Sequence, residues 1–183
     1  MANTNKFLYL DYNGFAAVNR SLRVFVYFQL AFFVPFFIGQ PQLLVGTIVN
    51  AMLVISALEL DTKRTIPVIF APSLAVLARG LIFGPFTPFL ALMVPFIWAS
   101  NALLVIIVKS LKNRRDYWIS LGLAVVAKSG FLFLSALALI SLSVLPVLFL
   151  TTMGELQLVT AILGGVVAFS AIKSGATKKL DLI

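Results

Sequence analysis

Uninterrupted apolar runs separated by short polar segments dominate this chain. The clearest run extends from Phe86 to Val108 without a charged residue. A helix of about 23 residues is roughly 34 Å long, enough to cross a hydrocarbon core of about 30 Å. The run continues directly into a basic cluster typical of the cytoplasmic side of a membrane, formed by Lys109, Lys112, Arg114 and Arg115. The stretch therefore predicts a transmembrane helix with a defined orientation.

Five further apolar runs predict five further spans. We expect them at residues 24–38, 43–58, 66–83, 117–142 and 156–172. The third of the six spans contains Pro67 and Pro72. Because proline removes a helical hydrogen bond and disfavours helix at the preceding residue, we expect a broken or partly unwound helix near Phe70–Pro72.

The end of the chain holds one shorter apolar segment and the last span. The segment from Ser143 to Gly154 is too short to cross a bilayer, so we expect an outer loop folded back onto the membrane surface and able to act as a lid. The last span contains Gly164 and Gly165 in succession, which indicates close packing against another helix.

The composition supports a membrane protein. The 183 residues are 61% hydrophobic and 11% charged, with a mean hydropathy of +1.08. Soluble domains are typically about 45–50% apolar and about 25% charged. We therefore expect an all-α integral membrane protein, a compact bundle of six transmembrane helices with both termini cytoplasmic. Its predicted parts are a cytoplasmic N-terminal segment 1–23, the six-helix domain 24–172 and a basic cytoplasmic tail 173–183.

The net charge of +8 follows from topology in this interpretation and does not indicate nucleic-acid binding. Of the 14 basic residues, all but Arg79 and Lys128 fall in segments predicted to face the cytoplasm. These are Lys6, Arg20, Arg23, Lys63, Arg64, Lys109, Lys112, Arg114, Arg115, Lys173, Lys178 and Lys179. The predicted outer loops hold none, as the positive-inside rule requires.

Several kinds of chemistry are absent from the sequence. There is no cysteine and no histidine, which excludes disulfides, thiolate zinc sites and cysteine-bound iron–sulfur clusters. No phosphate-binding loop of the Gly-x-x-x-x-Gly-Lys-Ser/Thr type occurs. We therefore expect no metal site, no cofactor and no enzymatic activity.

Two charged residues within the predicted spans are candidates for function. Lys128 lies near the midplane of the fifth span, where a lysine costs roughly 2.5–3.5 kcal/mol and requires a partner or a wet cavity. In a functional role, it contacts a ligand or acts as an ion-pair switch. In a structural role, it bonds to backbone carbonyls or extends its ammonium toward the inner surface of the membrane. Arg79 lies about one turn from the outer end of the third span. It either holds an anionic ligand group or extends to outer head groups.

Uncharged polar and aromatic residues complete the set of candidates. Asn50 and Asn101 are amides in apolar helices, which bond either to other helices or to a ligand. Trp98, one turn before Asn101, either walls a pocket or packs in the core. Glu155, which begins the sixth span with Gln157, either gates a pocket or caps the helix. We expect an outward-opening site lined by the third to sixth spans, with candidates Arg79, Trp98, Asn101, Lys128, Gln157, Asn50 and Glu155.

Four stretches resemble a known family: 42–51, 71–75, Val94-Pro-Phe-Ile-Trp-Ala-Ser-Asn-Ala102 and Glu155-Leu-Gln-Leu-Val-Thr-Ala-Ile-Leu-Gly-Gly165. They resemble a family of small six-span prokaryotic membrane proteins that is similar to the substrate-binding S components of energy-coupling factor transporters. Some members carry the label "iron hydrogenase", which does not suit a chain without cysteine. The likeness extends from about Leu22 to Ile172.

The resemblance implies a multi-pass subunit in the plasma membrane of a prokaryote. Such a subunit captures a vitamin or other micronutrient from outside, and a transmembrane coupling subunit with two ATP-binding subunits then releases it inward. This chain departs from the pattern in its first span, where Ala31 has no alanine four residues away, and it lacks the N-terminal Met-His motif of metal-specific members. Two alternatives are a structural or regulatory membrane protein without transport activity and a proton-coupled secondary transporter that uses Lys128.

Overall fold

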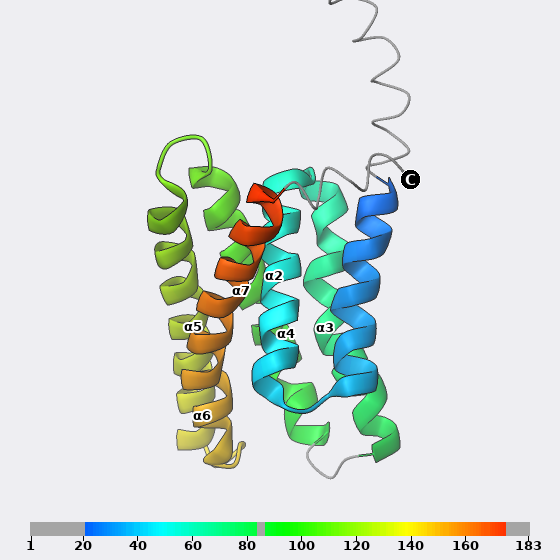
Figure 1. The fold of residues 1–183 in the computed structure, drawn as a ribbon. Helices are drawn as coiled ribbons and strands as arrows, with labels where there is room; N and C mark the ends of the chain where they lie inside the picture. Colours follow the sequence, from blue (N-terminus) through cyan, green and yellow to red (C-terminus); the bar gives the residue numbers. More distant parts are fainter. Residues whose placement is uncertain (1–20, 84–86, 175–183) are drawn as a thin grey trace, which may run out of the picture.

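The computed structural model describes residues 21–83 and 87–174, and all its regular elements there are helices (Figure 1). The first helix, Ser21–Ile38, ends in the π-helical segment η1 (Val34–Ile38). It is followed by α2 (Gln42–Glu59), α3 (Thr62–Phe83), α4 (Thr87–Leu111), α5 (Tyr117–Ser141), α6 (Leu148–Met153) and α7 (Glu155–Lys173). The all-α fold is confirmed. Residues 1–20 of the predicted N-terminal segment and 175–183 of the predicted tail lie outside the described residues.

Within the described residues, five helical stretches are long and apolar enough to cross a membrane. They are Ser21–Ile38, Gln42–Glu59, Thr87–Leu111, Tyr117–Ser141 and Leu148–Lys173. These stretches are compatible with a multi-pass membrane protein. α3 is not among them, although its 22 residues make it longer than α2.

The helices run alternately up and down between two ends of the bundle (Figure 1). The upper end in Figure 1, called here the basic end, carries residues 59–64 and 109–116. The lower end, called here the open end, carries the turn at residues 39–41 and the segment 142–154. Residues 112–116 hold Lys112, Arg114 and Arg115, whereas the described residues of the two open-end segments hold no basic side chain.

α2 is the central helix and packs most closely against α7. Gly164 makes this approach possible: a Cβ at this position would lie 2.6 Å from Asn50 Cβ and 2.8 Å from the backbone nitrogen of Ala51. Gly46 on α2 faces Thr160 on α7 in the same way. The sequence expectation of close packing at the Gly164–Gly165 pair therefore agrees with the structure.

α3 is continuous, so the predicted break near Phe70–Pro72 is wrong. Proline leaves a helical carbonyl without its usual donor and perturbs the turn before it. Pro72 removes the N–H that would donate to Val68 O, and the bond from α4 goes to the next carbonyl, from Asn101 Nδ2 to Ile69 O at 3.2 Å. The helix therefore continues through both prolines, and Asn101 ties the turn before Pro72 to α4.

Apolar side chains fill the half of the bundle nearest the basic end. The larger core includes Leu53, Val54, Leu104, Val105 and Val108 from α2 and α4. Lys109 near the end of α4 and Lys112 just after it close this end against the C-terminal end of α2. Lys109 Nζ donates to Leu60 O at 2.7 Å, and Lys112 Nζ donates to Leu58 O at 3.0 Å. Cations at the C-terminus of a helix are favourable because the unsatisfied carbonyls there carry partial negative charge.

Candidate functional site

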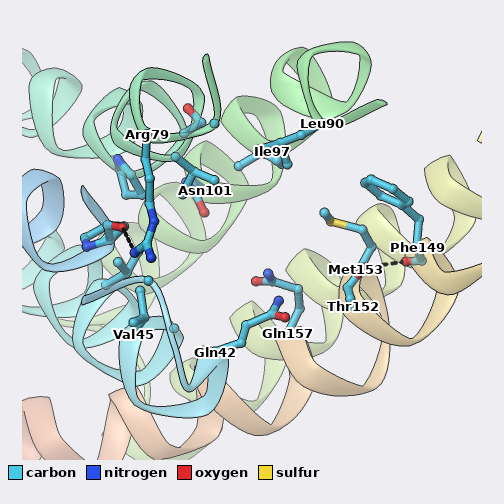
Figure 2. A pocket seen from close by; sticks show the side chains of 18 of the residues that line it. Gln42, Val45, Arg79, Leu90, Ile97, Asn101, Phe149, Thr152, Met153 and Gln157 are labelled. Carbon is cyan, nitrogen blue, oxygen red and sulfur yellow. Dashed lines mark hydrogen bonds between the residues drawn. The ribbon is translucent and has the colours of Figure 1, made fainter. Parts of the chain in front are cut away.

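A cavity of about 520 Å³ occupies the other half of the bundle, nearest the open end (Figure 2). Its lining comes from the end of the first helix, the turn at 39–40, and helices α2 to α7. The polar lining residues are Gln40, Gln42, Asn50, Ser73, Arg79, Thr87, Asn101, Lys128, Thr152 and Gln157. The lining runs from the open end to Asn50, Asn101 and Lys128, which lie deep within their helices.

Lys128 lies at the deepest part of the cavity. Its side chain is almost fully buried, and Nζ donates a hydrogen bond to Asn50 Oδ1 at 2.5 Å. Asn50 Nδ2 in turn donates to Gly46 O at 2.9 Å and to Thr160 Oγ1 at 3.1 Å. The network therefore joins α5 to α2 and α7 and gives the buried ammonium one neutral acceptor.

No acidic residue within the described ranges 21–83 and 87–174 lines the cavity. The four acidic residues of the described chain lie elsewhere: Glu59 pairs with Arg23, Asp61 with Arg64, Asp116 caps the start of α5, and Glu155 is exposed. The lining nevertheless includes two cationic side chains, Lys128 and Arg79. The described part of the site is thus positively charged, and no carboxylate of its lining neutralises it.

Arg79 lies nearer the open end and reaches into the cavity from α3 (Figure 2). Its Nη1 lies 3.4 Å from the carbonyl oxygen of Pro35, at the end of the first helix. The guanidinium packs directly over Gly39, whose φ of +62° favours glycine and where any Cβ would collide with Arg79. Arg79 therefore holds the turn after the first helix against α3.

The remaining walls are mostly apolar. Val45 and Val49 come from α2, Leu90 and Ile97 from α4, and Phe149 from α6. Figure 2 shows Gln42 and Gln157 entering the cavity from α2 and α7. An apolar enclosure of a few hundred Å³ with a few inward polar groups is typical of sites for small organic molecules.

The structure brings together five of the seven candidate residues. Asn50, Arg79, Asn101, Lys128 and Gln157 all line the cavity. The lining is wider than the expected third to sixth spans, because the end of the first helix and α2 contribute as well.

The other two candidates do not line the cavity. Trp98 packs between α3 and α4, where Nε1 donates to Ser73 Oγ at 2.5 Å and the ring meets Phe70 edge to face. Glu155 is exposed in the first turn of α7, a position favourable for an acidic side chain. Trp98 touches the site only through Ser73, which is itself a lining residue.

The sequence interpretation missed several polar lining residues: Gln40, Gln42, Ser73, Thr87 and Thr152. Each is uncharged and lies in the part of a helix nearer the open end or in the turn before a helix, where a polar residue is not unusual. One indication of these lining residues was present in the sequence, since Gln40 and Gln42 flank a proline in a segment without charge.

In the described residues, no group of three His, Cys, Asp or Glu side chains is placed to hold a metal ion. The comparisons with known proteins add no assignment. No protein-family model matches the chain, and no curated protein or solved structure matches it either.

Proposed function

We propose that the chain is a substrate-binding membrane subunit of the S-component type, which captures a small molecule from outside the cell for import. The observation that supports this most directly is the cavity, which has a buried polar floor and lies at the end of the bundle opposite the basic segments. Basic segments mark the cytoplasmic side of membrane proteins. The open end then faces outward.

The proposal includes six spans, with α3 as the sixth membrane-crossing helix. Its 22 residues correspond to roughly 33 Å of helix, which is enough to cross a bilayer. α3 packs between α2 and α4, and Arg79 of α3 extends into the cavity. A helix that carries an arginine toward an internal cavity keeps that charge away from lipid.

The proposal also requires partner subunits, a transmembrane coupling subunit and two ATP-binding subunits. The sequence contains no phosphate-binding loop, so the chain has no recognisable means of hydrolysing ATP itself. The half of the bundle nearest the basic end is filled by the larger apolar core. Release of a ligand inward then needs a rearrangement that a partner drives.

One observation favours a purely structural role instead. Lys128 already has a protein acceptor, Asn50, and this bond joins α5 to α2 without any ligand. In that alternative the polar floor only holds helices together. Binding measurements separate the two functions, since a structural protein has no reason to bind a small molecule in this cavity.

The first test concerns topology. Reporter fusions at residue 183 and in the turn at residues 39–41 are expected to report a cytoplasmic C-terminus and an external turn. The reason is that an even number of spans returns the chain to the side marked by its basic segments. An external C-terminus would contradict the six-span arrangement. The fusion at residues 39–41 is the control, because it is expected to report the opposite side of the membrane.

The second test concerns transport. The purified chain, reconstituted alone in liposomes with radiolabelled vitamins outside, is expected to bind at least one of them without accumulating it. Native mass spectrometry of the protein extracted in mild detergent is the matching binding measurement. Concentrative uptake by the lone chain, driven by a proton gradient, would contradict the proposal and favour the secondary transporter. Absence of any bound small molecule in both measurements would favour the structural role.

A further inference from the structure

The charges of the cavity say more about its ligand, if the proposed function holds. Two cationic groups line it, Lys128 at its floor and Arg79 nearer the open end, and none of the four acidic residues of the described chain does. A ligand cation would meet two like charges in a poorly hydrated space, which is unfavourable. A ligand anion would find two opposite charges there.

The floor also offers unused hydrogen-bonding capacity. An ammonium has three N–H donors, and within the described residues the structure records one hydrogen bond from Lys128 Nζ, to the neutral oxygen of Asn50. For Asn101, which also lines the cavity, the recorded bond comes from Nδ2 and goes to Ile69 O. A buried cation gains most from an anionic acceptor, because such bonds are roughly twice as strong as neutral ones.

From this geometry we infer that the cavity takes a small organic acid, with its carboxylate on Lys128 Nζ and its apolar body against the walls formed by α2, α4 and α6. The walls determine the kind of anion. A carboxylate carries one charge and is attached to a carbon skeleton that suits Val45, Val49, Ile97 and Phe149. A phosphate is more heavily charged and costs more to remove from water, and the floor offers only one ammonium for it.

Arg79 has a different role from Lys128 in this inference. It lies nearer the open end and its recorded acceptor is a neutral carbonyl, Pro35 O, at the long distance of 3.4 Å. A positive charge near the mouth of a poorly hydrated cavity raises the local concentration of anions and their association rate. Arg79 therefore attracts the acid, and Lys128 retains it. Loss of Arg79 slows association, whereas loss of Lys128 speeds dissociation.

Matched probe molecules test this inference. The probes are trios of a carboxylic acid, its primary amide and the corresponding primary amine, each built on alkyl, phenylalkyl and indolylalkyl skeletons. Binding to the purified protein is measured by thermal shift and by titration calorimetry at millimolar probe concentrations. We expect the carboxylate of at least one trio to bind at least about tenfold more tightly than its amide, and the amine not to bind.

Three variants assign the effect to the cavity. Lys128→Met is expected to weaken carboxylate binding at least about tenfold and to leave amide binding unchanged. Arg79→Gln is expected to lower the association rate of the carboxylate and to make that rate less dependent on salt, while the dissociation rate changes less. If Lys128→Met fails to fold, Arg79→Gln provides the test of the cavity. Lys63→Gln removes one positive charge from an exposed position at the basic end and is expected to change neither the affinity for the carboxylate nor its association rate.

The outcomes separate this inference from the proposed function. Preferential binding of amides or amines, or equal carboxylate binding by Lys128→Met and the unaltered protein, would overturn the inference while leaving a ligand site in place. A co-purified neutral or cationic molecule would also overturn the inference, and so would the failure of every carboxylate probe to bind. A protein that binds no member of any trio and carries no co-purified small molecule would contradict the proposed function as well.

Discussion

Asn50→Leu is expected to lower the free energy of unfolding by about 2–3 kcal/mol, because it leaves the Lys128 ammonium in an apolar interior without its recorded acceptor. Leucine also breaks the bond from Asn50 Nδ2 to Thr160 Oγ1 between α2 and α7. Lys128→Met in the same chain removes the buried charge, so the double variant is expected to recover most of the lost stability. Unfolding of all three variants in mixed detergent micelles measures the coupling as a double-mutant cycle.

The matched control is Asn101→Leu. Asn101 is also a buried amide in an apolar helix, but its recorded bond goes to the neutral carbonyl of Ile69. We expect this substitution to cost about 1 kcal/mol, the usual net value of a neutral hydrogen bond. If the double variant were no more stable than Asn50→Leu alone, Lys128 would not depend on Asn50, and the network between α5 and α2 would have no energetic role.

Gly164→Ala is expected to destabilise the protein by about 2–3 kcal/mol, within the range for overpacked cores. The added methyl would lie 2.8 Å from the nitrogen of Ala51 and 2.9 Å from the carbonyl carbon of Asn50, so it meets the backbone of α2, which cannot rotate away. The helices must separate, and this pair is the most extensive helix contact in the described bundle. Thermal unfolding in detergent measures the effect.

Substitutions of two other glycines serve as controls for this prediction. At Gly165 the three atoms nearest to the added methyl all belong to the side chain of Leu121, which is able to adopt another rotamer, so Gly165→Ala is expected to cost less. At Gly130 no heavy atom lies within 4 Å of the added methyl, and Gly130→Ala is expected to be neutral or to stabilise by about 0.5–1 kcal/mol, since alanine favours helix. Equal changes in stability at Gly164 and Gly130 would show that the close contact of Gly164 with the backbone of α2 does not limit stability.

The positions of the helices were predictable from the sequence because hydropathy and helix length depend on the residues of one segment. The span expected at 43–58 corresponds to α2, Gln42–Glu59, and the span at 117–142 corresponds to α5, Tyr117–Ser141. The segment 143–154 was less predictable. It was expected as a loop, but it contains α6, whose Phe149 and Met153 line the cavity. A short apolar run fits either a loop or a single helical turn against the bundle.

The features that depend on two helices were not predictable. Asn50 and Lys128 each stood out as polar groups in apolar spans, yet their bond joins residues 78 positions apart. α3 continues through Pro72, where the local proline rule gave the wrong answer, and the turn before Pro72 is bonded to Asn101 of α4. Trp98 was expected to wall a pocket or to pack in the core, and Ser73 on another helix supplies its indole acceptor. In each case the deciding partner lies on another part of the chain.

Lys109 near the end of α4 and Lys112 just after α4 cap the C-terminal end of α2, which has a consequence for ion leakage if the chain spans a membrane as proposed. Together with the apolar core beside them, they fill the basic end of the described bundle, and the lining of the cavity does not extend there. A cavity that stops at mid-depth offers no continuous path for protons or other ions. In the proposed membrane orientation, copies of this chain without a partner would therefore not leak ions and would leave the membrane potential intact.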